Sequence, residues 1–194
     1  MISWTKLLTA RSQEHDNLRY SSSLSHVPKI VVWNTTSNCN LKCRHCYLEA
    51  TSSQPFGELS KVQAENFIED LANMGVAVLL FTGGEPLLRK DIFHLGQFAK
   101  ERGLRPVLST NGTLITKEVA RQIKQAGFVY VGISLDGTQA TNDMFRQNKG
   151  AFLNALSGIR YCRDAGIKVG LRFTLTLCLL CLSVAFMNIH AVFM

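Results

Sequence analysis

Residues 39–47 read Cys-Asn-Leu-Lys-Cys-Arg-His-Cys-Tyr and place three cysteines, Cys39, Cys43 and Cys46, in one short segment after the apolar run 30–33. Thiolates are soft ligands that suit iron–sulfur clusters or zinc. A zinc site normally needs a fourth protein ligand, and no further cysteine pair follows nearby. Three thiolates on a four-iron cluster leave one iron open to a small molecule. A zinc site and three unrelated buried cysteines remain alternative interpretations.

The chain of 194 residues is 46% hydrophobic and 18% charged, which is typical of a globular domain with a sizeable core. A complete eight-unit α/β barrel needs about 250 residues, so the chain is too short for one. The formal net charge is +7, but the basic residues are dispersed along the sequence. A basic surface of this kind would also suit a carboxylate-rich ligand, and we expect no nucleic-acid partner.

The cysteines and the two ends of the chain bear on its compartment. Six cysteines occur without an apolar signal region at the N-terminus, so we expect reduced thiols in a cytoplasmic protein. Residues 175–194 contain no Asp, Glu, Lys or Arg. By length this run could just span a bilayer, although a membrane anchor is the less favoured interpretation.

Five short apolar runs alternate with amphipathic stretches of helical period. Ser60 followed by Gln63 predicts a capping box at the start of the first helix, and Gly75 is typical of its end. Such alternation forms βαβ units with right-handed crossovers. The sequence therefore predicts an α/β fold, a partial (β/α) barrel of about five parallel strands and four connecting helices. The expected strands are 30–33, 76–81, 106–108, 128–133 and 168–173, and the expected helices lie within 60–75, 91–102, 117–126 and 150–166.

Four unusual segments follow the expected strands at the ends where α/β barrels bind their ligands. They are the cysteine segment, Thr-Gly-Gly-Glu-Pro at 82–86, Ser-Thr-Asn-Gly at 109–112 and Ser-Leu-Asp-Gly at 134–137. Because the carboxyl ends of parallel strands gather on one rim, these segments should surround one site.

The Gly-Gly turn offers groups that can hold a cationic amine. Gly83 and Gly84 allow the backbone to approach a ligand closely. Their carbonyls and the Glu85 carboxylate can accept hydrogen bonds from an ammonium group. An ordinary strand-to-helix turn is the alternative interpretation.

Short polar side chains at the next two strand ends, Asn111, Ser134 and Asp136, suit ribose hydroxyls or a carboxylate. Arg172 on the fifth strand could pair with a cofactor carboxylate through a bidentate fork. Each has a plain alternative, since Asn111 and Asp136 precede glycines as turn residues do and Arg172 could be a solvated side chain. We assign no catalytic residue.

The spacing CxxxCxxC, followed one βα unit later by Gly-Gly-Glu-Pro, resembles the signature of the radical S-adenosyl-L-methionine (SAM) superfamily over residues 28–175. The resemblance implies a [4Fe–4S] cluster on Cys39, Cys43 and Cys46, with SAM on the open iron and its amino group at 83–85. It also implies that the third and fourth strand ends hold the ribose and methionine parts of SAM. An electron from a flavodoxin- or ferredoxin-type donor would cleave SAM, and the adenosyl radical would abstract hydrogen from substrate.

A narrower likeness appears in residues 1–8, 18–20 and 31–36, which look like the heme-biosynthesis branch of this superfamily. That branch implies a siroheme-derived tetrapyrrole as substrate, on a route to heme or heme d1. Peptide-modifying radical SAM maturases share much of the core and are one alternative. A non-catalytic metal-binding module and an inactive gene fragment are the others.

These observations divide the chain into an N-terminal extension 1–28, a radical SAM core 29–176 and an aberrant apolar tail 177–194. Relatives of this kind continue into a sixth strand and a cysteine-rich extension, so we interpret the chain as C-terminally truncated, with the final barrel units missing and tetrapyrrole turnover not expected. We expect Cys162 to be a buried side chain. Cys178 and Cys181 are not expected to hold a second cluster.

Overall fold

The computed structural model describes residues 28–48 and 57–174. The predicted tail 177–194, and the predicted N-terminal extension except for Pro28, lie outside these residues. Cys178 and Cys181 lie outside them as well. The expectations for these segments stay predictions.

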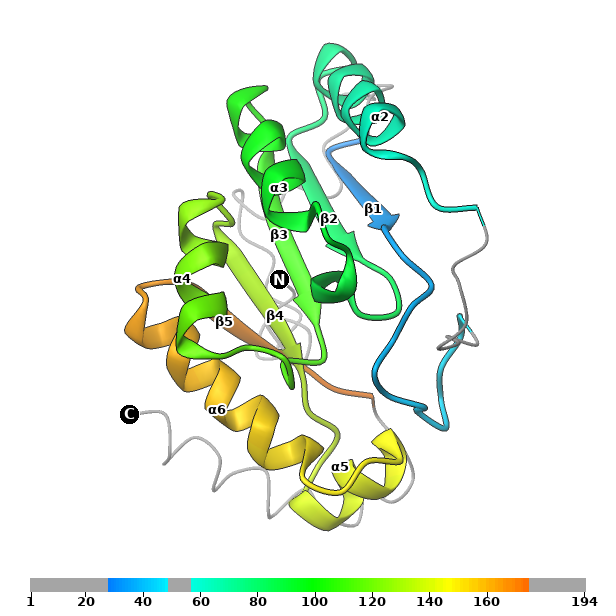
Figure 1. The fold of residues 1–194 in the computed structure, drawn as a ribbon, viewed down its shortest axis with the longest axis vertical. Coiled ribbons are helices and arrows are strands. Elements are labelled where there is room, and N and C mark those ends of the chain that lie inside the picture. The colour runs from blue at the N-terminus through cyan, green and yellow to red at the C-terminus, as the bar shows by residue number, and fades with distance from the viewer. Residues whose placement is uncertain (1–27, 49–56, 175–194) are drawn as a thin grey trace, which may run out of the picture.

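Five parallel strands form one sheet at the centre of the described residues (Figure 1). They pair in chain order, each in parallel with the next. This arrangement confirms the predicted α/β fold of five parallel strands in a partial barrel. The strands are β1 (Ile30–Asn34), β2 (Val78–Thr82), β3 (Arg105–Thr110), β4 (Tyr130–Ser134) and β5 (Lys168–Arg172).

The four predicted helices lie along one face of the sheet (Figure 1). They are α2 (Lys61–Asn73), α3 (Ile92–Glu101), α4 (Lys117–Gln125) and α6 (Ala151–Asp164). The predicted start of α2 is confirmed, because the Gln63 backbone N–H donates to Ser60 Oγ and the Ser60 N–H donates to Gln63 Oε1. Gly75 has φ +80°, the left-handed conformation expected after a helix.

The count of four connecting helices was wrong, because the chain forms two further short elements. A 3-10 helix, η2 (Pro86–Leu88), follows the Gly-Gly turn, and α5 (Gln139–Arg146) follows β4. η2 is too short to show a hydrophobic period, and α5 contains only three apolar positions, Ala140, Met144 and Phe145. α5 begins at Thr138, whose hydroxyl accepts from the Thr141 N–H, and lies at the carboxyl ends of the strands (Figure 1).

The core lies between the sheet and its covering helices. Leu79, Phe81, Leu108 and Val131 point into it and are fully buried. On the edge strand β1, Val32 on the opposite face is 59% exposed. Successive side chains of a strand point to opposite faces, so one face of each strand packs under the helices. The strand ends lie at the edge of this core and can carry polar groups.

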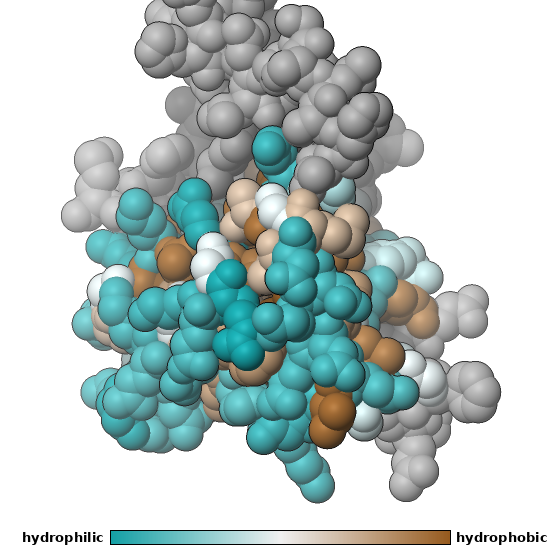
Figure 2. All heavy atoms as spheres, turned by 90° about the horizontal axis from the view of Figure 1, so that it is seen from above, coloured by the Kyte–Doolittle hydropathy of each residue, from teal (hydrophilic) through white to brown (hydrophobic). Residues whose placement is uncertain are grey.

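The outer surface seen from above in Figure 2 is mostly hydrophilic over the described residues, with hydrophobic side chains in small groups. None of the described helices is long and apolar enough to cross a membrane.

Candidate functional site

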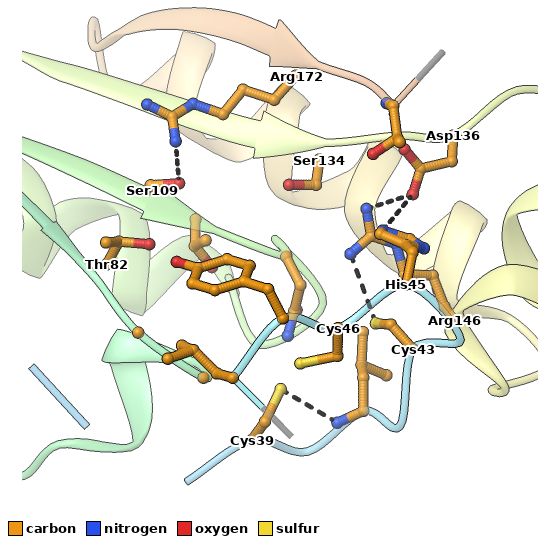
Figure 3. Close-up of a pocket in the computed structure, with 18 of the residues that line it drawn as sticks. Cys39, Cys43, His45, Cys46, Thr82, Ser109, Ser134, Asp136, Arg146 and Arg172 are labelled. Atoms are coloured by element: carbon orange, nitrogen blue, oxygen red, sulfur yellow. Dashed lines mark hydrogen bonds and ion pairs between the residues drawn. The ribbon is translucent and has the colours of Figure 1, made fainter. Parts of the chain in front are cut away.

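A cavity of about 380 Å³ lies at the carboxyl ends of the strands (Figure 3). It brings together residues from all four segments that the sequence singled out. Of the predicted site residues, only Glu85 is absent from its lining. The predicted residues that line it are Cys39, Cys43, Cys46, Gly83, Gly84, Asn111, Ser134, Asp136 and Arg172.

The three cysteines of the cavity carry free thiols and are each partly exposed. The Leu41 backbone N–H points at Cys39 Sγ, 3.4 Å away. Burial is the main effect that raises the pKa of the Cys39 thiol, and the Glu85 carboxylate and the other two cysteines raise it further. Coordination to a metal would deprotonate this thiol despite its raised pKa.

Within the described ranges, no three His, Cys, Asp or Glu side chains are arranged to hold a single metal ion. In a four-iron cluster each thiolate binds a different iron, so the ligands stand farther apart than around one ion. Three thiols that line one cavity, with the guanidinium of Arg146 beside Cys43, suit such an anionic cluster. The residues present therefore fit the cluster that the sequence predicts.

The Gly-Gly turn packs directly against the segment that leads into Cys39. The Gly84 N–H donates to Thr36 O at 2.7 Å, and the Glu85 N–H donates to Asn38 O at 2.7 Å. A Cβ atom at Gly83 would lie 2.4 Å from Thr36 O, and one at Gly84 would lie 2.2 Å from Asn38 O. These glycines are needed for close approach to the chain itself, as well as for any approach to a ligand.

The Glu85 side chain turns into the protein and is fully buried. Its carboxylate accepts hydrogen bonds from the Asn111 N–H at 2.8 Å, the Leu87 N–H at 3.1 Å and the Thr110 hydroxyl. Burial raises the pKa of Glu85 to about 6, against the lowering effect of these three donors. We expected this carboxylate to accept from a ligand amine, whereas the structure occupies it with donors of its own chain.

Asn111 reaches the cysteine segment rather than open space. Its side-chain amide donates to Asn40 Oδ1 at 2.9 Å, and the Asn40 amide donates to the Thr113 hydroxyl at 2.9 Å. The Thr113 hydroxyl and N–H in turn donate to Asn111 Oδ1. The end of β3 thereby holds the segment between Cys39 and Cys43 in place.

Asp136 is buried and paired with a residue that the sequence reasoning missed. Its Oδ2 accepts from Arg146 Nη2, and His45 Nε2 lies 3.6 Å from the same oxygen (Figure 3). Its Oδ1 accepts from the Thr174 N–H at 3.0 Å. No sequence signal marks Arg146, because it lies at the end of a helix that the pattern did not reveal.

Ser134 and Arg172 lie on the opposite side of the cavity from the cysteines (Figure 3). Arg172 Nη1 donates to the Ser109 hydroxyl at 2.5 Å. A Cβ atom at Gly132 would lie 2.7 Å from Arg172 Nε. The glycine in β4 thus leaves room for the guanidinium to lie across the sheet toward β3.

The fold, the three-cysteine segment and the Gly-Gly-Glu-Pro turn define the class of protein. A model of the Radical SAM superfamily matches residues 33–181. The chain belongs to this superfamily.

Among curated proteins, the chain is similar to two synthases. It is 47% identical over 186 residues to the Fe-coproporphyrin III synthase of Methanosarcina barkeri. This match covers 90% of the present chain and 47% of the synthase. It is 48% identical over 147 residues to the pre-heme d1 synthase of Dinoroseobacter shibae. This second match covers 76% of the present chain and 36% of the synthase. The chain therefore spans half or less of the length of these relatives.

Among solved structures, the chain is similar to "Native anSMEcpe with bound AdoMet", with a TM-score of 0.62 and 23% identity. The match covers 73% of this chain and 42% of that one. At this identity the likeness bears on the fold alone, and it agrees with the partial barrel described above.

Proposed function

We propose that this chain forms the SAM-cleaving core of a radical SAM enzyme that acts on a siroheme-derived tetrapyrrole, on a route to heme or heme d1. The observation that carries the proposal is the cavity that gathers Cys39, Cys43 and Cys46 beside the Gly83–Gly84 turn. The similarity to the two synthases supports the tetrapyrrole as the substrate class.

Cys39, Cys43 and Cys46 would hold three irons of a [4Fe–4S] cluster. When bound, the cluster supplies the one-electron reduction of SAM that leads to hydrogen abstraction from the substrate. The chain's own part is to bind both molecules in register and to keep water from the reacting atoms. The low-potential electron would come from a flavodoxin- or ferredoxin-type donor in the cytoplasm.

The remaining lining residues offer partners for each polar part of SAM. The carbonyls of Gly83 and Gly84 suit the ammonium group, and the Ser134 hydroxyl suits the ribose hydroxyls. The Asn111 side chain is already engaged by Asn40 and Thr113, so we assign it the task of holding the cysteine segment in place. The Arg172 guanidinium suits a carboxylate. Asp136 and Glu85 are already engaged by Arg146 and Thr110, so we assign them the task of holding the site in shape.

The test is anaerobic reconstitution with iron and sulfide, followed by an assay for 5′-deoxyadenosine with SAM and a reductant. We expect a brown protein that forms this product, and we expect Cys43→Ala to lose both the cluster and the product. Cys162→Ala is the control, because Cys162 is fully buried in α6 and does not line the cavity. A colourless protein that binds zinc, or a Cys43→Ala variant with the iron content of the parent, would overturn the proposal.

The substrate class is tested separately in two binding assays. One uses a siroheme-derived tetrapyrrole, and the other uses a peptide. We expect the tetrapyrrole to bind and the peptide not to bind. Binding of the peptide alone would favour the maturase alternative.

A further inference from the structure

The geometry at α5 carries an assignment that the sequence did not suggest. We propose that Arg146 is a positioning residue that raises the reduction potential of the cluster through Cys43, with Asp136 holding its guanidinium in place. The inference rests on the proposed function, because it presupposes a cluster on Cys39, Cys43 and Cys46.

Arg146 contacts a predicted cluster ligand and a carboxylate at the same time. Its Nη1 lies 3.6 Å from Cys43 Sγ, and its Nη2 donates to Asp136 Oδ2 (Figure 3). The guanidinium is a rigid planar fork, so the bond to Asp136 fixes the direction of the N–H that faces the sulfur. A lysine ammonium could carry the same charge, but it would not be oriented in this way.

The groups around Arg146 hold it firmly against the cysteine segment. Asp136 is 2% exposed, and its backbone N–H donates to Asn142 Oδ1 at 3.0 Å. The Arg44 backbone N–H donates to Phe145 O at 2.8 Å, which docks the end of α5 on the residue next to Cys43. If the guanidinium swung away, it would leave a buried carboxylate without its cation, which is costly.

A purely structural ion pair leaves one feature of Arg146 unexplained. The residue is 9% exposed, yet its Nε is buried and has no hydrogen-bond partner among the described residues. A buried donor without an acceptor costs free energy. Arg146 also lines the cavity, so its guanidinium lies beside the space that an anionic group would enter.

The charge of Arg146 favours the reduced form of a cluster. One electron from the donor adds one negative charge, and a cation beside a ligand sulfur stabilises that charge. Net charge and hydrogen bonds to the sulfurs are two of the properties that set the potential of such clusters.

The experiment is a redox titration of the reconstituted protein without SAM, followed by electron paramagnetic resonance. We expect Arg146→Gln to retain its iron and sulfide but to be about tenfold harder to reduce, a fall of about 59 mV for one electron. Arg146→Lys keeps the charge and should recover part of that shift. Arg160→Gln, which removes an exposed arginine of α6, is the matched control and should keep the parent potential.

Each outcome separates this inference from the function on which it rests. If the parent protein takes up no cluster, the proposed function fails. If Arg146→Gln carries a full cluster at the parent potential, the present inference is wrong and the proposed function stands. If Arg146→Gln cannot hold the cluster, Asp136→Asn decides. Its amide oxygen can still accept from Arg146 Nη2 and hold the guanidinium in place, but it no longer compensates the positive charge, so the potential should rise. An unchanged or lower potential in Asp136→Asn would overturn the inference.

Discussion

The Thr110 hydroxyl lies 2.8 and 2.9 Å from the two carboxylate oxygens of Glu85, in the interior between the ends of β2 and β3. This contact joins the Gly-Gly turn to the last residue of β3, directly before Asn111. Because Asn111 in turn binds Asn40, the hydrogen bonds run from the turn to the cysteine segment. Glu85 therefore acts on the site through the chain rather than by lining the cavity.

Burial of Glu85 should make stability depend on pH. Its pKa is raised from the ordinary value of 4.5 to about 6. The folded state therefore holds this proton more tightly than the unfolded state, and the stabilisation is present below about 4.5 and lost as the pH rises through about 6. A rise in pKa from 4.5 to about 6 corresponds to about 2 kcal/mol.

Urea unfolding of the apoprotein and of Glu85→Gln across this pH range checks the prediction. The parent should lose about 2 kcal/mol relative to the variant as Glu85 ionises. Glu101→Gln removes an exposed carboxylate of α3 and reports the effect of losing one surface charge. A constant difference between parent and Glu85→Gln at every pH would show that Glu85 does not titrate in this range.

The Asn40–Asn111 hydrogen bond should contribute measurably to docking of the cysteine segment. A double-mutant cycle of Asn40→Ala and Asn111→Ala should give a coupling of about 1 kcal/mol in the free energy of unfolding. Asn154→Ala, on the exposed face of α6, should change stability by less than about 0.5 kcal/mol. A coupling near zero would mean that the segment is held by other contacts.

The position of Arg172 in the cavity predicts a role in ligand affinity. Arg172 lines the cavity and should bind a carboxylate, so Arg172→Gln should weaken SAM binding about tenfold or more. Cluster content should stay unchanged, since Arg172 lies across the cavity from the cysteines (Figure 3). Titration of the reconstituted variant with SAM is the measurement, and unchanged affinity would assign Arg172 to another ligand or to the sheet alone.

The sequence was sufficient to predict the strands and the rim that they share. Parallel strands place every strand end on one edge, so Cys39, Gly83, Ser134 and Arg172 could be assigned to one site without knowledge of side-chain directions. Capping at Ser60 was equally local, because the Ser60 hydroxyl and Gln63 are only three positions apart.

The rest depended on contacts that no local pattern encodes. Arg146 and Cys43 are 103 positions apart, and their contact follows from how the short helix α5 docks. The direction of Glu85 was equally undetermined, because two glycines precede it and strand alternation does not extend through them. The chemistry of the site could therefore be predicted, but the identity of the residues that support it could not.

Gly84 lies where the turn meets the segment before Cys39, and the backbone there leaves no room for a side chain. A Cβ atom there would lie 2.2 Å from Asn38 O and 2.8 Å from Ser37 O, and both are backbone atoms that cannot rotate away. Gly84→Ala should therefore separate the turn from the cysteine segment. We expect a loss of about 1–3 kcal/mol in the free energy of unfolding and a lower iron content after reconstitution.

Gly132→Ala is the matched control, because its Cβ would meet the Arg172 side chain at 2.7 Å rather than backbone. The arginine can move aside, so this variant should lose the bond to Ser109, keep its iron content, and change stability by less than about 1 kcal/mol. Urea unfolding and iron analysis of both variants provide the comparison. Equal stability and equal iron content in the two variants would contradict this prediction. The steric conflict at Gly84 would then be relieved without effect on the site, and the cysteine segment would tolerate displacement of the turn.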